Sequence, residues 1–254
     1  RLSRKAVNDF RDRLLASGRS EMITRKILGV LRLVLNHAMN NGRVHSNAAQ
    51  GVRVLRSSRL DYKVSVPPKQ DVKSLIDDAT GRFRAMLVVS ALCGSRASET
   101  HGLRWADVDF ADGFLNVRQH ADFCGTLGEP KSAAGHRSVP AGPFVLNTLK
   151  EWKLACPKGD LDLVFPSSDG SVADHANTVR RHFKPLCDKL KIKLRWHGMR
   201  YFAASLWIAG VLDQGGHDLR GARLGADDHG ALRHLFPTPD HQHGMVQVEQ
   251  RVFG

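Results

Sequence analysis

The chain has 254 residues, 42% of them hydrophobic, which allows a sizeable core in either one large domain or a small and a medium one. Its 38 lysines and arginines outnumber 25 aspartates and glutamates, and the formal net charge of +13 favours a polyanionic partner such as nucleic acid over a merely basic soluble protein. The four cysteines form no C-x-x-C pair, which excludes the usual zinc-site spacing and favours reduced thiols. No apolar stretch approaches the roughly 18 residues of a membrane span, so we expect no membrane partner and a cytoplasmic location.

Two helices are expected in residues 1–55. The first covers about Ser3–Ala16 and ends at Gly18, and the second covers about Met22–Asn40 and stops at Asn41-Gly42. Apolar residues recur at helical spacing in both, and the basic residues of the second fall outside its apolar stripe. We interpret this stretch as a small helical unit with a basic surface, although an ordinary solvated helix face would look the same.

A connection follows over residues 56–68. Its basic residues, among them Arg56, Arg59 and Lys63, stand in a stretch of little periodicity that Pro67-Pro68 closes. The segment is either a basic linker lying along a phosphate backbone or an irregular packed connection. Both readings separate the first helices from a larger domain.

Residues 69–254 are predicted to form that larger domain, which is mainly helical with a small antiparallel β-sheet and therefore of the α+β class. The last predicted helix is Trp196–Val211. The other predicted helices are Asp71–Ala79, Arg84–Leu92, Ala97–Leu103, Phe144–Ala155 and His175–Leu190. The predicted strands are Phe114–Gln119, His136–Pro140 and Leu163–Phe165.

Three motifs stand in a recognisable order along this domain. The run Ala91-Leu92-Cys93-Gly94-Ser95-Arg96-Ala97-Ser98-Glu99, continued by Leu103-Arg104-Trp105, resembles the first arginine motif of the tyrosine recombinase (phage integrase) family. Glu129-Pro130-Lys131-Ser132 with Arg137-Ser138-Val139-Pro140 resembles the lysine-bearing β-hairpin of that family, and His197-Gly198-Met199-Arg200 resembles its H-x-x-R box. The first helices resemble its core-binding domain, so the resemblance spans about residues 1–211.

The resemblance implies a fold and a set of partners. The fold would be the tyrosine-recombinase catalytic fold over residues 69–254, preceded by a partial helical core-binding domain over residues 1–55. Together they would grip double-stranded DNA as a C-shaped clamp, with self-association on the DNA. Neither a cofactor nor a metal is expected.

The chemistry explains why these residue types are needed. Breaking a phosphodiester without a metal requires cations on the non-bridging oxygens, and Arg96 and Arg200 suit that role because a guanidinium binds phosphate in a bidentate fork. Lys131 would donate a proton to the departing 5′ oxygen, and His197 would act as a general acid or base. Taken alone, each residue has a simpler reading, such as Arg96 pairing with Glu99 at a helix start.

The nucleophile breaks the pattern. The resemblance places a tyrosine near Leu232, but the only tyrosines of the chain are Tyr62 and Tyr201. Ala226 also replaces the histidine of a Leu-Gly-His motif. Many glycines between residues 212 and 233 disfavour the expected helices. We therefore expect an atypical segment from about residue 212, and we interpret it as the product of a frameshifted or decayed gene.

Three hypotheses follow. The first is a recombinase or integrase by descent whose activity is impaired by the loss of the nucleophile. The second is a non-catalytic DNA-binding protein that blocks sites or mixes with active recombinase subunits. The third is an unrelated basic helical module, in which the four predicted site residues would not converge. The histidines of the tail suggest a metal only weakly, because no cysteine or regular helical pair accompanies them.

Overall fold

The computed structural model describes residues 2–55, 66–130, 136–213 and 242–253. The chain divides into two compact units, Arg1–Tyr62 and Lys63–Gly254. Each unit has its own buried core. None of the helices in the described residues is long and apolar enough to cross a membrane.

The first unit consists of α1 (Arg4–Ala16) and α2 (Glu21–Asn40). Both helices begin at a serine whose side chain accepts a hydrogen bond from the first turn, at 3.1 Å for Ser3 and 3.3 Å for Ser20. Val7 of α1 and Leu28 of α2 lie in the core of this unit. The two predicted helices therefore agree with the structure within one residue at each end.

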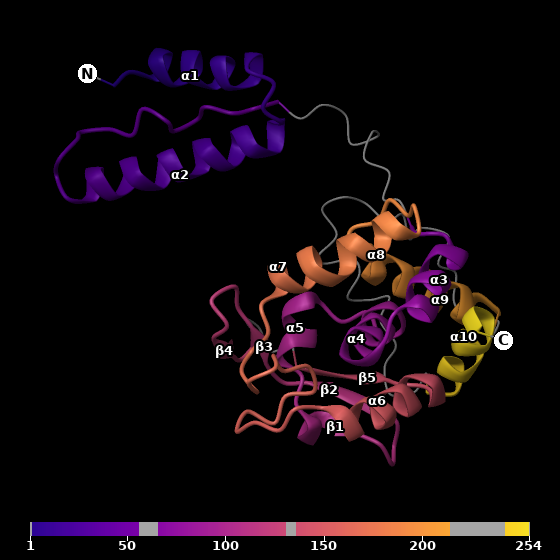
Figure 1. The fold of residues 1–254 in the computed structure, drawn as a ribbon. Coiled ribbons are helices and arrows are strands. Elements are labelled where there is room, and N and C mark those ends of the chain that lie inside the picture. The colour runs from indigo at the N-terminus through magenta and orange to yellow at the C-terminus, as the bar shows by residue number, and fades with distance from the viewer. Residues whose placement is uncertain (1, 56–65, 131–135, 214–241, 254) are drawn as a thin grey trace. The chain divides into compact units, whose positions relative to one another are not determined.

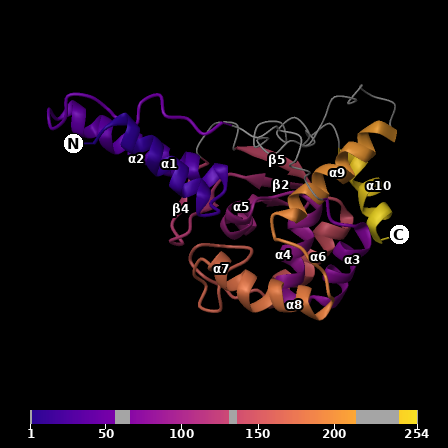
Figure 2. The same cartoon turned by 90° about the horizontal axis from the view of Figure 1, so that it is seen from above.

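The second unit is built around α4 (Gly81–Leu92). Its residues 85–92 are all buried, because α3 (Lys69–Asp78), α6 (Pro143–Ala155) and α9 (Gly198–Asp213) pack on it from different sides (Figures 1 and 2). A helix that is apolar on every face is stable only at the centre of a domain. The short helix α5 (Ala97–Gly102) follows α4 directly.

Two small antiparallel sheets accompany the helices. The first contains β1 (Val108–Asp109), β2 (Phe114–Val117) and β5 (Arg137–Pro140) in the order β1-β2-β5, with Leu115 opposite Val139. The second is the hairpin of β3 (His120–Ala121) and β4 (Leu127–Gly128). The mainly helical fold with a small antiparallel sheet is thus confirmed.

The predicted helix over residues 175–190 is present in three parts. It consists of α7 (His175–Thr178), a π-helical turn (Val179–Phe183) and α8 (Lys184–Lys189). Asp174 begins it by accepting a hydrogen bond from the backbone N–H of Asn177 at 2.5 Å.

Two predictions for this unit are wrong. Leu163–Phe165 is not a strand, since Leu163 makes only an isolated bridge to Arg104. The neighbouring residue Val164 is buried, and its backbone groups are bonded singly instead. Its N–H donates to the carbonyl of Leu103 at 2.8 Å, and its carbonyl accepts from the indole N–H of Trp152 at 2.6 Å.

The second error concerns the end of the chain. Trp196–Val211 is not the last helix, because α10 (Gln242–Phe253) packs against α9 and α3 (Figure 1). Met245 and Val252 enter the core, and Phe253 stacks on Phe144 with ring centroids 3.9 Å apart. Glu249 is buried and accepts the backbone N–H groups of Phe144 and Val145, at 2.8 and 3.2 Å. Helix α10 therefore caps the start of α6.

Candidate active site

Arg96 stands at the start of α5, in the turn that follows α4. Gly94 makes this turn possible with a φ of +59°, a conformation that favours glycine. The guanidinium of Arg96 donates to Glu99 at 2.7 Å, and the backbone N–H of Arg96 donates to the same carboxylate at 2.8 Å. The pairing of Arg96 with Glu99 considered from sequence therefore exists, and it fixes the arginine at the beginning of the helix.

Glu99 binds a second arginine. Arg137, the first residue of β5, donates both terminal nitrogens to the two carboxylate oxygens, at 3.0 and 2.6 Å. The Glu99 side chain is only 8% exposed. Burial alone would raise its pKa, but the bonds and charges of Arg137 and Arg96 outweigh burial and lower the pKa of Glu99 to about 2. The carboxylate is therefore ionised at any physiological pH.

Arg200 reaches the same turn from the other end of the sequence. It lies in the first turn of α9, is 4% exposed, and donates a hydrogen bond to the carbonyl of Gly94. Burial first, and then the positive charge of Arg96, lower the pKa of Arg200 to about 9, against the opposing effect of Glu99. Arg200 stays protonated at neutral pH, so two cations from distant segments share one neighbourhood.

The other predicted site residues have different outcomes. His197 precedes α9, is exposed, and lies edge-on to the ring of Tyr201 with centroids 5.0 Å apart, whereas Arg200 is buried. Tyr201 also influences the pKa of Arg200, since the two are sequence neighbours. Lys131 and Leu232 lie outside the described residues, as do Tyr62 and Ala226.

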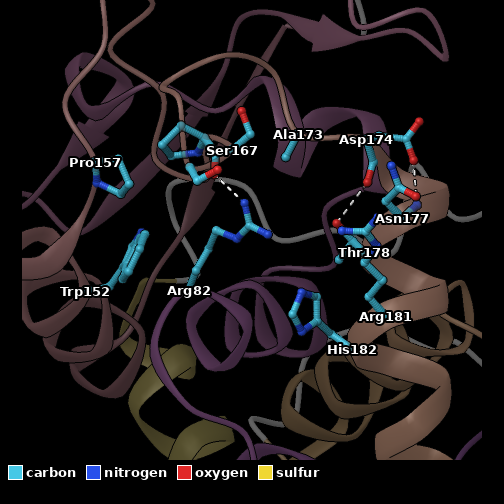
Figure 3. A pocket seen from close by; sticks show the side chains of 12 residues that line it. Arg82, Trp152, Pro157, Ser167, Ala173, Asp174, Asn177, Thr178, Arg181 and His182 are labelled. Atoms are coloured by element: carbon cyan, nitrogen blue, oxygen red, sulfur yellow. Dashed lines mark hydrogen bonds between the residues drawn. The ribbon is translucent and has the colours of Figure 1, made fainter.

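A separate pocket of about 390 Å³ contains none of the predicted site residues. Arg82 and Arg181 project into it from different elements, and Arg82 donates to the carbonyl of Pro166 (Figure 3). Asp174 and Asn177 at the start of α7 form another wall. The pocket is therefore distinct from the turn that holds Arg96 and Arg200.

A pair of histidines, of which His101 is buried and His175 is half-buried, lies at the C-terminal end of α5. His101 is 1% exposed, and its ring is edge-on to that of His175 with centroids 5.5 Å apart. Neither ring nitrogen of His101 has a hydrogen-bond partner among the described residues. Burial, reinforced by the charges of His175 and Arg82, lowers the pKa of His101 to about 4, so the imidazole is neutral at pH 7.

Sequence reasoning gave no role to Arg137 and treated Glu99 only as an alternative partner of Arg96. The available signal was a basic residue beginning a short strand directly after the Lys131 segment. That signal does not say which carboxylate the arginine meets, because β5 and α5 are brought together only by the tertiary fold.

Comparison with known proteins shows the family of the chain. The model of the phage integrase family matches residues 68–218, which include Arg96, Glu99, Arg137 and Arg200. The chain belongs to the phage integrase family. No group of three potential metal ligands occurs in the part of this family member that the structure describes.

The matches to curated relatives cover only part of the length of each relative. Prophage integrase IntR of Escherichia coli K12 is 28% identical over 134 residues, which make up 53% of this chain and 32% of that protein. Tyrosine recombinase XerC of Xylella fastidiosa 9a5c is 30% identical over 193 residues, which make up 73% of this chain and 58% of that protein. The chain thus spans less than two thirds of the length of these relatives.

Solved integrase structures share the fold. The Tn1549 transposon integrase, in complex with a circular intermediate DNA, is 17% identical with a TM-score of 0.67, and the match covers 99% of this chain and 85% of that one. A lambda integrase dimer bound to a core site is 15% identical with a TM-score of 0.62, over 87% of this chain and 81% of that one. At this level of identity the likeness concerns the fold.

Proposed function

We propose that this chain is a site-specific DNA recombinase or integrase by descent, which binds double-stranded DNA around a scissile phosphodiester but is impaired in cutting it. The observation that carries the proposal is the meeting of Arg96 and Arg200 at the turn of Gly94, from positions 104 residues apart. The net charge of +13 and the DNA in the solved complexes of the Tn1549 and lambda integrases support the same partner.

The proposed chemistry is transesterification. A tyrosine oxygen attacks phosphorus, the bond from phosphorus to the 5′ oxygen breaks, and the product is a 3′-phosphotyrosine with a free 5′ hydroxyl. Arg96 and Arg200 neutralise the charge that builds up on the non-bridging oxygens. Lys131 supplies the proton to the leaving 5′ oxygen, and His197 assists proton transfer at the rim of the site.

The impairment follows from the sequence. Neither Tyr62 nor Tyr201 stands near position 232, and Tyr201 directs its ring toward His197. The chain would therefore bind and polarise the phosphate without supplying the attacking oxygen. Self-association on DNA belongs to the same proposal, because the lambda integrase forms a dimer on a core site and a tetramer on a Holliday junction.

A covalent trapping assay tests this function. A duplex bound by the protein is selected from a random library, nicked, and incubated with the wild type and with Leu232→Tyr. We expect salt-sensitive binding by both proteins, no adduct with the wild type, and a denaturation-resistant adduct with the variant. An adduct with the wild type refutes the impairment, and the absence of selectable duplex binding refutes the function as a whole.

The replacement of the Leu-Gly-His histidine by Ala226 favours a second candidate. A chain that lacks two site residues is suited to occupy a recombination site without cutting it, or to form mixed assemblies with active subunits. Sequence-specific binding that slows cleavage by an active relative would support this role. An equal cleavage rate in the presence of saturating protein would exclude it.

A further inference from the structure

We infer that Arg137 is a positioning residue, which acts through Glu99 to hold Arg96 in place and to leave the positive charge of Arg96 available to a phosphate. The inference deepens the proposed function and rests on it. It assigns a task to a side chain that neither the motif chemistry nor the comparisons single out.

The geometry of Glu99 is the first support. Each carboxylate oxygen receives two donors: Oε1 accepts from the guanidinium groups of Arg96 and Arg137, at 2.7 and 3.0 Å. Oε2 accepts from the backbone N–H of Arg96 and from Arg137, at 2.8 and 2.6 Å. A carboxylate held by four N–H groups cannot rotate, so it presents a fixed surface to Arg96.

Exposure separates the roles of the two arginines. The side chain of Arg96 is 34% exposed, whereas that of Arg137 is 19% exposed. The more open Arg96 is the better placed to contact a ligand, and the more covered Arg137 is turned toward the carboxylate in a bidentate fork. Arg137 therefore suits support of Arg96 rather than direct contact with DNA.

Charge gives the second support. Without Arg137, the cluster of Arg96, Glu99 and Arg200 would carry a net charge of +1, with the charge of Arg96 offset by the buried Glu99. With Arg137 present, three arginines face one carboxylate, so the cluster of Arg96, Glu99, Arg137 and Arg200 carries a net charge of +2. A positive cluster of this size matches an anionic phosphodiester.

The position of Arg137 connects two parts of the predicted site. It begins β5 opposite Val117 of β2, six positions after Lys131. Its bond to Glu99 therefore joins the strand that returns from the lysine segment to the helix that starts with Arg96. A change at residue 137 would alter Arg96 without removing any of the four predicted site residues Arg96, Lys131, His197 and Arg200.

The salt dependence of DNA binding tests this inference. The dissociation constant for the selected duplex is measured against salt concentration for the wild type, Arg137→Gln, and Arg137→Gln combined with Glu99→Gln. We expect Arg137→Gln to lower the steepness of log K against log salt by about 1, with roughly tenfold weaker binding at 0.1 M salt. The reason is that Glu99 would then neutralise Arg96, and the phosphate contact of Arg96 would be lost. The double variant should return to the wild-type slope, since an uncharged residue 99 no longer neutralises Arg96.

A purely structural role for Arg137 predicts a different pattern, in which the double variant binds no better than the single one. Arg84→Gln is the matched control, because Arg84 is a partly covered arginine paired with Glu151 outside the cluster, at 3.7 Å. An unchanged slope for Arg137→Gln, as for this control, overturns the inference. If Arg137→Gln does not fold, the double variant decides alone: a slope lowered by about 1 overturns the inference. If the wild type binds no duplex, the proposed function and the inference fall together.

Discussion

Replacing His101 by leucine should reduce the loss of stability of the second unit between pH 7 and pH 5 by about 2 kcal/mol. His101 is buried beside His175, and neither of its ring nitrogens has a partner among the described residues. Protonation would place a charge in an apolar site near Arg82, which explains the low pKa of about 4. Leucine has a similar volume and cannot be protonated.

The magnitude follows from proton linkage. The pKa of His101 is about 4 in the folded protein and 6.5 without the fold, so the unfolded chain binds the proton more tightly. A depressed folded-state pKa gives stability that is fully present above pH 6.5 and is lost as the pH falls toward 4. Between pH 7 and pH 5 this single side chain accounts for a loss of about 2 kcal/mol in the free energy of unfolding.

Urea unfolding followed by tryptophan fluorescence measures this loss selectively. All four tryptophans lie in the unit from Lys63 to Gly254, at positions 105, 152, 196 and 207. The wild type should lose about 2 kcal/mol more than His101→Leu between the two pH values. His136→Gln, at an exposed histidine, should behave as the wild type. Equal losses in the wild type and His101→Leu would refute the reasoning.

Two further substitutions probe the cluster and the C-terminal helix. Glu99→Gln should reduce the loss of stability between pH 4.5 and pH 2.5 by about 2 kcal/mol. The folded-state pKa of Glu99 is lowered to about 2, so the stability that its carboxylate contributes disappears as the pH falls through that value. Urea titrations at the two pH values measure this loss, and an equal loss in the wild type and the variant would contradict the prediction. Gly142→Ala should destabilise the second unit by about 1–3 kcal/mol, because the added methyl group would overlap the carboxylate of Glu249. A urea midpoint equal to that of the wild type would show that Glu249 does not hold α10 against the start of α6.

Local sequence patterns were enough for most of the fold. The apolar repeats of α1, α2 and α6 predicted their extents closely, since those helices bury one face. The start of α4 was placed too late, at Arg84 instead of Gly81, because a helix buried on all sides carries no amphipathic boundary. Leu163–Phe165 showed the composition of a strand, but its backbone groups are hydrogen-bonded in single contacts rather than in a sheet.

The candidate site was only partly predictable. The motifs pointed to Arg96 and Arg200, and their chemistry is legible because arginine is suited to phosphate. The link between Glu99 and Arg137 spans 38 residues and two elements, so no local pattern could assign it. Helix α10 was missed for a related reason: its anchor, Glu249, is a charged residue in the core, whereas periodicity assigns such a residue to the surface.

The docking of α10 also constrains the history of the gene. Met245 and Val252 fill the core, and the carboxylate of Glu249 satisfies the first backbone groups of α6, so three side chains in a short segment suit their surroundings. A shifted reading frame would supply unrelated residues at all three positions. If the frame changes after the codon of Val211, the fit of these three side chains favours a return to the original frame before the codon of Met245, in the interval where the resemblance places a tyrosine.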